Sequence, residues 1–304
     1  REVKTMAITG TGTPINRSNI QLPNEVSAEI LQKTQEASIV MRLARQIPLP
    51  GNGVQIPVIA SDPAAEWVTE TGAKPVSTPT LDKKIMQAHK LAVIVPFSNE
   101  FRRDASALYN ALIARLPAVL AEKFDQTVFF GPSSGTLANF DNLSAVTGYD
   151  LGATGASTYA GLVAADGAIS AQGGVMNGIA LAPQGKSALL GAVDGENRPL
   201  FNTVTENGIT RVLGAPVQIS KAAYKAGTTS PAVADVVGIA GDWNHAMYGT
   251  VEGIQIRYSS DATLAVSGGT INLFQQNMFA VLVEIEVGFV AETAYFAKLT
   301  KAHA

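Results

Sequence analysis

Two strand-like runs with a long polar connection between them constrain this chain more than any other feature. The runs are VQIPVI at 54–59 and HKLAVIVPF at 89–97, and AEWVTETGAKPVSTPTLDKK at 65–84 lies between them. The loops of β-hairpins usually have about two to five residues. A connection this long is typical of a binding loop, of a disordered tip, or of an arm that is completed by a partner.

The composition predicts a surface with few charges. Of the 304 residues, 46% are hydrophobic and 15% are charged, whereas about 25% charged residues is usual for soluble proteins. This deficit fits a surface covered by neighbouring subunits, and it also fits a chain rich in Gly and Ala. The net charge of −3 argues against electrostatic binding of nucleic acid, and the absence of Cys excludes disulfides and thiol chemistry.

The chain shows no targeting or membrane segment. No secretory pattern follows Arg1, and the longest uncharged stretch, 262–283, is interrupted by Gly, Asn and Gln. We therefore expect no membrane association. A start at Arg1 fits the removal of an N-terminal segment and fits a shortened chain equally well.

The clearest helix is expected to begin at Ser98 and to continue to about Gly131. Ser98 suits an N-cap, Glu100 in the first turn suits the helix dipole, and apolar residues recur every three or four positions. Pro117 is expected to kink this helix. Another helix is expected over 25–45, after an extended arm.

The second half of the chain is expected to contain an α/β domain and closing strands. Between 131 and 269, short apolar runs alternate with stretches of Gly, Ala, Ser and Thr, which favours alternating helices and strands. The segment 272–300 is strand-like. Alternate residues over 283–289 are apolar, and Glu284 lies on the opposite face.

No motif of an enzyme is complete. The tripeptide GKS at 185–187 lacks the earlier Gly of a phosphate loop, since Ala180 stands there, and a polar turn before a helix explains it. Asp242 follows a strand-like run, as an active-site carboxylate can, but it has no second catalytic group nearby. None of the histidines has a partner at metal-ligand spacing; they are His89, His245 and His303.

Seven short motifs occur together in one order, and in that order the chain resembles the major capsid proteins of tailed bacteriophages with the Hong Kong 97-type fold. The resemblance covers about residues 22–300, and Asn197 stands where the family usually has Gly. The motifs are AEWVTETGAKPVSTPTL, KLAVIVPFSNEFRRD, FDQTVFFGPSSG, LLGAVDGENRPLF, VLGAPV, GIAGDWNHAMYGTVEGIQI and NMFAVLVEIEVGFVAETAYFAKL.

The resemblance implies an α+β fold with an extended hairpin and two domains. The long polar connection becomes the family's E-loop, an arm that reaches over a neighbouring subunit. The implied parts are an N-arm (1–50), the E-loop (51–96), a peripheral domain with a long spine helix (97–131), an axial α/β domain (132–270) and the closing strands of the peripheral domain (271–304).

The resemblance also implies what the protein does. A major capsid protein self-assembles as hexamers and pentamers into the icosahedral head shell of the virion, in the cytoplasm of the bacterial host, and encloses double-stranded DNA by weak non-specific contact. A portal and a scaffold or protease are further implied partners, and no cofactor or metal is expected. The residues expected to make inter-subunit contacts on the arm are Trp67, Glu70, Lys74, Pro75 and Pro79.

Some members of the family join neighbouring subunits by covalent bonds, and the resemblance implies which residues of this chain would react. Lys83 would attack the side-chain amide of Asn277 in another subunit, ammonia would leave, and Glu284 of a further subunit would accept the proton. The attack needs a neutral amine, whereas an ordinary lysine has a pKa of about 10.4. Lys84 and Lys74 are alternative donors.

Two other functions remain open from the sequence. An encapsulin-type nanocompartment shell shares the fold, although the long N-arm and the arm motif favour a phage. A secreted α/β enzyme or surface protein using Asp242 and Glu284 belongs to a different class. The lack of a signal sequence and of a catalytic cluster weighs against it.

Overall fold

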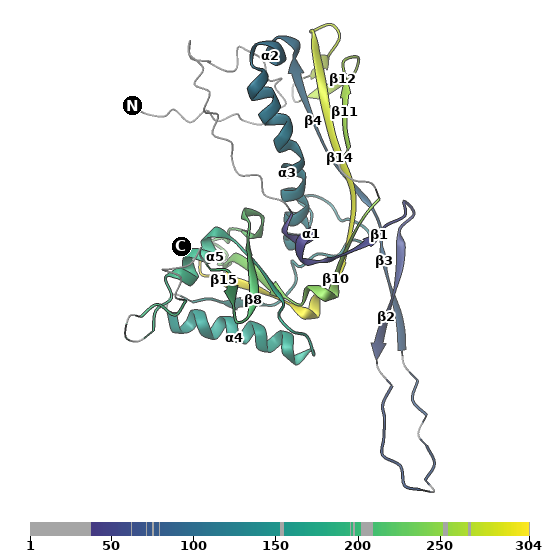
Figure 1. Cartoon of the computed structure of the whole chain (residues 1–304), viewed down its shortest axis with the longest axis vertical. Coiled ribbons are helices and arrows are strands. Elements are labelled where there is room, and N and C mark those ends of the chain that lie inside the picture. Colours follow the sequence, from purple (N-terminus) through teal and green to yellow (C-terminus); the bar gives the residue numbers. More distant parts are fainter. Residues whose placement is uncertain are drawn as a thin grey trace. The chain divides into compact units, whose positions relative to one another are not determined.

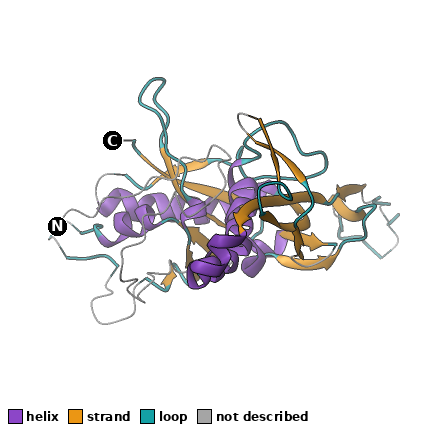
Figure 2. Ribbon diagram, turned by 90° about the horizontal axis from the view of Figure 1, so that it is seen from above, coloured by secondary structure: helices purple, strands orange, loops and turns teal. Residues whose placement is uncertain are grey.

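The computed structural model describes residues 38–303, except 62, 71, 75, 79, 153–154, 195, 197, 202–208, 252–254 and 267–268. The extended arm and most of the helix expected over 25–45 lie outside the described residues. Helices and strands are interspersed along the chain (Figures 1 and 2), which confirms a mixed α+β fold. The described residues form two compact units. The first unit contains Lys90–Ala121 and Glu252–Ile285. The second unit contains Ser38–His89, Glu122–Val251 and Glu286–Ala304.

The first unit contains the predicted N-cap. Ser98 ends strand β4 (His89–Ser98), and its hydroxyl accepts a 3.1 Å hydrogen bond from the amide of Phe101 in helix α2 (Asn99–Asp104). The expected single helix is divided, because Ala105 leaves the helical conformation and helix α3 (Ser106–Phe130) begins after it. No helix among the described residues is both long enough and apolar enough to cross a membrane.

A cluster of aromatic rings fills the interior of the first unit. Phe97 on β4 stacks on Phe101 at 5.9 Å and on Phe279 at 5.8 Å between ring centroids. Tyr109 of α3 meets the Phe97 ring edge-on at 5.3 Å. Aromatic pairs in these geometries stabilise a core beyond their buried area, so the rings hold α2, α3 and the sheet together.

Strand β14 (Met278–Ala291) belongs to a five-stranded sheet and pairs with three of its strands. In the first unit it pairs antiparallel with β11 (Gln255–Ser259), and β4 also pairs with it. Its alternate side chains are buried between 283 and 289, and Glu284 lies on the opposite face, as predicted. A hairpin of β12 (Thr263–Val266) and β13 (Gly269–Asn272) packs its apolar residues against the start of β14.

The second unit contains a six-stranded sheet in the order β5-β15-β9-β6-β8-β7, with helices α4 (Gly155–Ala171) and α5 (Pro183–Leu190) packed against it. Strand β15, which lies within the segment 271–304 that is expected to supply the closing strands of the peripheral domain, pairs with β9 here. The strands are β5 (Gly148–Asp150), β6 (Gly178–Leu181), β7 (Arg211–Val212), β8 (Ala215–Ile219), β9 (Asp235–Gly241) and β15 (Phe296–Lys301).

A second sheet region of this unit joins the chain's early residues to the end of β14. Strand β1 (Arg45–Pro48) pairs parallel with β10 (Ala246–Thr250), which pairs antiparallel with β14. The short helix α1 (Ile39–Leu43) precedes β1, and Asp125 of α3 accepts hydrogen bonds from its first amides. The single-turn 3₁₀ helices are η2 (Lys221–Ala223), η3 (Trp243–His245) and η4 (Thr293–Tyr295).

Candidate functional site

The polar connection predicted as an arm is a two-stranded ribbon with a long irregular tip (Figure 1). Strands β2 (Val54–Ser61) and β3 (Thr80–Met86) pair antiparallel over their whole length. Beyond the ribbon, the amide of Ala64 donates a 2.9 Å hydrogen bond to the hydroxyl of Ser77, which ties the two sides of the tip together. The arm is therefore an ordered hairpin that extends beyond its strands.

The tip of the arm exposes apolar side chains. Trp67 is fully exposed and Val76 is 93% exposed. Glu70 and Lys74 are exposed beside them, so three of the five residues expected to make contacts on the arm are accessible to a partner. The two prolines expected to contact a neighbour lie outside the described residues; they are Pro75 and Pro79.

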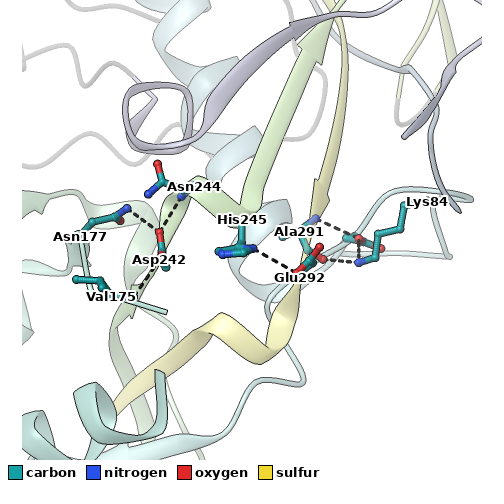
Figure 3. Close-up of polar contacts among 9 residues, drawn as sticks. Lys84, Val175, Asn177, Asp242, Asn244, His245, Ala291 and Glu292 are labelled. Atoms are coloured by element: carbon teal, nitrogen blue, oxygen red, sulfur yellow. Dashed lines mark hydrogen bonds and ion pairs between the residues drawn. The ribbon is translucent and has the colours of Figure 1, made fainter. Parts of the chain in front are cut away.

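The root of the arm is fixed by Lys84 (Figure 3). Its amine donates to the carboxylate of Asp141 at 3.1 Å and to the carbonyl of Ala291 at 2.6 Å. The same carboxylate accepts a hydrogen bond from the amide of Ala291. Met86, at the end of β3, is buried against Leu49. The amine of Lys84 is thus engaged in holding the arm.

Lys83 points away from this anchor. Neighbouring residues of a strand face opposite sides, and the side chain of Lys83 is exposed. Within the described part of the chain, its amine makes no hydrogen bond or ion pair. Of the two adjacent lysines at the end of the arm motif, Lys83 is therefore the exposed one, and Lys84 is the one held by hydrogen bonds.

Asn277 lies in the turn before β14. Its backbone adopts a left-handed conformation (φ 53°), which Asn tolerates better than most residues. Its side-chain nitrogen donates to the carboxylate of Glu100 at 2.6 Å. Its side-chain oxygen accepts a hydrogen bond from the side-chain nitrogen of Asn99 at 2.8 Å. The side chain is exposed yet held on both ends.

Glu284 does not take part in the contacts that Asn277 makes with Asn99 and Glu100. It lies on β14, seven positions after Asn277, which is roughly 23 Å at the rise of an extended strand. Its carboxylate faces the guanidinium of Arg257 at 3.3 Å and the amine of Lys90 at 3.9 Å, and its side chain is only 12% exposed. The expected reaction takes Asn277 and Glu284 from different copies, so their separation within one chain does not bear on it.

A cavity of about 600 Å³ has Asn99, which contacts Asn277, in its wall. Aromatic rings and one cation form much of its wall, because Arg102 lies over the ring of Phe279 at 4.9 Å and Tyr258 is 60% exposed at its rim. The residues that line it are Asn99, Arg102, Tyr109, Tyr258, Ser259, Ser260 and Phe279.

Asp242, the carboxylate considered for an enzyme, has a structural role (Figure 3). It is buried at the end of β9 and accepts hydrogen bonds from the amide of Val175, the side chain of Asn177 and the amide of Asn244. These contacts cap the 3₁₀ turn that follows. A carboxylate saturated by local donors is poorly placed to act on a substrate.

The other motifs considered for chemistry also have local explanations. The tripeptide at 185–187 lies inside helix α5 and not in a turn before it. The side chain of His245 stacks on the ring of Tyr295 and pairs with Glu292 at 3.2 Å. His303 pairs with Asp235, and His89 contacts the carbonyl of Ala138.

Comparisons with known proteins agree with this architecture. The chain is 27% identical over 303 residues to the probable major capsid protein gp17 of Mycobacterium phage L5, covering 93% of this chain and 90% of that one. It is 24% identical to the major capsid protein of Staphylococcus phage 80alpha, covering 92% and 85% of the two chains.

Solved structures share the fold. A chain from Gordonia phage Cozz matches with a TM-score of 0.77 at 23% identity, over 93% of this chain and 92% of that one. A capsid chain of an empty GTA particle matches with a TM-score of 0.66 at 15% identity, over 92% and 95% of the two chains. The fold is therefore that of the Hong Kong 97-type class of shell proteins. The model of the phage capsid family matches residues 19–300, so this chain belongs to the phage capsid family.

Sequence reasoning missed that Asn99 and Glu100 contact the side chain of Asn277. Ser98 and Glu100 were assigned to the start of a helix, and that assignment is correct. Nothing in the local pattern indicates that the same helix start meets a turn that lies 177 residues further along the chain.

Proposed function

We propose that this chain builds the head shell of a tailed phage by packing its arm onto a second copy. As a member of the phage capsid family, it is a structural subunit of the virion and not an enzyme. The observation that supports the arm's role is the exposure of Trp67 and Val76 on a hairpin whose root is anchored. Exposed apolar side chains of this size mark interaction sites.

The energy available from this contact is large enough to drive assembly. Burying a Trp removes about 150–250 Å² from water, and at about 25 cal/mol per Å² this is roughly 4–6 kcal/mol as an upper bound. Ordering of the interface reduces that figure. Because closure of a shell repeats the contact for every subunit, a modest net gain at each interface suffices.

The finer assignments of the fold belong to the same proposal. We assign the N-arm to residues 1–50, the E-loop to 51–96, the peripheral domain to 97–131 with 271–304, and the axial domain to 132–270. In the shell, the axial parts would meet at the centres of hexamers and pentamers. A portal, a scaffold or protease, and weakly held DNA are the further partners of such a subunit.

A covalent bond between copies is the second part of the proposal. The neutral amine of Lys83 attacks the side-chain carbonyl carbon of Asn277 in another copy, the new amide bond forms, and the former amide nitrogen leaves as ammonia. The exposed amine of Lys83 and the accessible Asn277 support this pairing. The engaged amine of Lys84 argues against the alternative donor.

Electron microscopy of the concentrated chain, with a denaturing gel of the same sample, tests both parts. Closed shells or capsomer rings are expected, and a ladder of covalent multimers that K83A removes is expected on the gel. Monomers only, from both this chain and a version with any natural N-terminal extension, would contradict assembly. A ladder that persists in K83A would contradict the Lys83 bond.

Fluorescence gives an independent readout of the arm. Only two tryptophans occur in the chain. In W243F, emission from Trp67 should shift to shorter wavelength when shells form, because an exposed indole becomes buried. In W67F, emission from the already buried Trp243 should stay unchanged. Equal behaviour of the two variants would contradict burial of the arm tip.

A further inference from the structure

Three lysines of the second unit gather around the end of helix α3 and the loop that follows it. We propose that Lys123, Lys225 and Lys298 form a binding site for the phosphate backbone of duplex DNA, which the proposed shell would enclose. This inference rests on the proposed function and gives the weak contact with DNA a defined place on the subunit. It concerns a local cluster of cations, which the net charge of −3 does not reveal.

Helix α3 and its following loop bring the three amines into one region. The amine of Lys225 lies over the ring of Phe130, the last residue of α3, at 5.6 Å from the ring centroid. Lys123 lies on the same side of α3 as Phe130, because seven positions are about two turns of a helix, or about 10 Å. The amine of Lys298 donates a 3.0 Å hydrogen bond to the carbonyl of Ser144, later in the same loop.

Each of the three lysines stands on a part of the chain that is held in place. The backbone of Lys225 exchanges two hydrogen bonds with Val236 of β9, at 3.0 and 2.9 Å. Lys298 belongs to β15, which lies between β5 and β9 in the sheet. The amine of Lys123 donates to the hydroxyl of Ser133. Groups ordered in advance lose less entropy when a ligand binds.

Lys298 and Lys225 lie close enough for their charges to act on each other. Burial lowers the pKa of Lys298, and the positive charge of Lys225 lowers it further. Both effects make the charged form of Lys298 less favourable in the isolated subunit. An anion placed near the two amines would reverse this, because an opposite charge within about 4–6 Å favours the charged form.

The carboxylates around this cluster are engaged with other partners. Glu122 accepts a hydrogen bond from the side chain one turn later in α3, at 3.4 Å. Asp141, in the loop, pairs with Lys84 at 3.1 Å, and Asp235 of β9 pairs with His303 at 2.6 Å. Within the part of the chain that the structure describes, none of the three amines forms an ion pair with a carboxylate.

Duplex DNA suits this arrangement better than a single small anion does. The cluster extends over at least about 10 Å along α3, and duplex DNA carries one negative charge about every 1.7 Å along its axis. A lysine amine is a compact charge on a flexible stem, so it contacts phosphates without reading the sequence of bases. Three amines on an acidic chain therefore fit a weak contact that is independent of sequence.

Anisotropy of a labelled DNA duplex, titrated with the dispersed full chain, tests the inference. If two or three phosphates are neutralised, the logarithm of the binding constant should fall against the logarithm of the salt concentration with a slope of about −2 to −3. This slope corresponds to a loss of affinity of about 10- to 40-fold between about 50 and 200 mM salt.

Single substitutions locate the contact. K123Q and K225Q should each weaken binding and bring the slope about 1 closer to zero. K298Q should do the same, whereas K298R keeps the charge and should bind like the wild type. K74Q makes the same change of net charge on the arm, so it is the matched control and should keep the wild-type slope. Since Lys225 is exposed, K225Q tests the site even if K298Q does not fold.

The outcomes separate this inference from the proposed function. Wild-type binding that does not depend on salt, or K225Q that binds like the wild type, would overturn the DNA site and leave assembly intact. Tighter binding of poly-glutamate than of the duplex would assign the cluster to an acidic protein segment and would also overturn it. Dispersed chains that bind DNA as expected but never form shells would contradict the proposed function and leave the cluster in place.

Discussion

The two tryptophans of this chain lie in opposite surroundings within the same unit. Trp243 is 2% exposed, its indole nitrogen donates to the carbonyl of Gly178 at 3.0 Å, and its ring meets Phe296 edge-on at 5.2 Å. A Cβ added at Gly178 would lie 2.7 Å from that indole, so the close contact requires glycine there. Trp67, on the arm, is fully exposed.

The contrast shows which apolar surface holds the subunit together and which remains for a neighbour. The indole of Trp243 has its hydrogen bond and its packing inside the chain, so it stabilises the folded subunit. Trp67 does not contribute buried apolar area to the stability of the folded subunit, because its side chain stays in water. The same residue type therefore serves the stability of the subunit in one place and association in the other.

The largest effect is expected from removing the buried ring. W243A should lower the free energy of unfolding by about 3–5 kcal/mol, because it loses the buried area and leaves a cavity beside Gly178 and Phe296. Chemical denaturation of the dispersed subunit measures this change. An unchanged midpoint would mean that Trp243 does not support the core.

A smaller effect on the interface is expected from the exposed ring. W67A should leave the free energy of unfolding within about 0.5 kcal/mol and raise the concentration needed for assembly at least tenfold. Light scattering against concentration measures the second quantity. V175A, which alters an exposed apolar side chain off the arm, is the matched control and should assemble normally. Equal assembly of W67A and wild type would break the comparison.

The interior also holds a carboxyl group that should make stability depend on pH. Burial raises the pKa of Asp125 from 3.8 to about 6, against the hydrogen bonds from Ser38, Ile39 and Val40, and the charge of Glu122 raises it further. Since the folded pKa lies above the unfolded one, the contribution of this group to stability is greatest below about pH 4 and is lost as the pH rises through 6.

The matching variant is D125N, which carries no titrating group at this position. Between pH 4 and pH 7, the free energy of unfolding of the wild type should fall relative to D125N by at most about 3 kcal/mol. Denaturation series at several pH values measure the difference between the two curves. Parallel curves would show that Asp125 titrates normally.

The smallest effect is expected at the root of the arm. K84A should lower the free energy of unfolding by about 1 kcal/mol or less, because the pair with Asp141 is partly exposed and such pairs contribute little. Assembly should suffer more than stability, because the hydrogen bond to Ala291 orients the ribbon. K83A, its neighbour on the opposite face, should change neither quantity. A larger loss of stability in K83A than in K84A would contradict the assignment of the two lysines.

Much of the fold could be predicted because its signals are local. The cap at Ser98 and the alternation along β14 follow from neighbouring residues and are confirmed. The family, predicted from motifs in order, is confirmed by the match over residues 19–300. The division of the long helix at Ala105 was missed, since alanine is a good helix former and carries no breaking signal.

The candidate site was predictable only in part. The sequence picked out Lys83 and Asn277, and the structure leaves both exposed. It could not separate Lys83 from Lys84, because two adjacent lysines differ only in the side of the strand that each one faces. It also could not find Glu100 as the neighbour of Asn277, because that contact depends on where β4 ends and where β14 begins.

By itself, then, the sequence determined the class of the fold, the exposed arm and the family, because each depends on the pattern and order of nearby residues. The tertiary structure alone decided which Trp is buried, which lysine is engaged and which carboxylate meets the side-chain amide of Asn277. Those outcomes depend on the path of the chain. It brings Asn277 to Glu100, 177 positions away, whereas Glu284, only seven positions away, pairs with Arg257 instead.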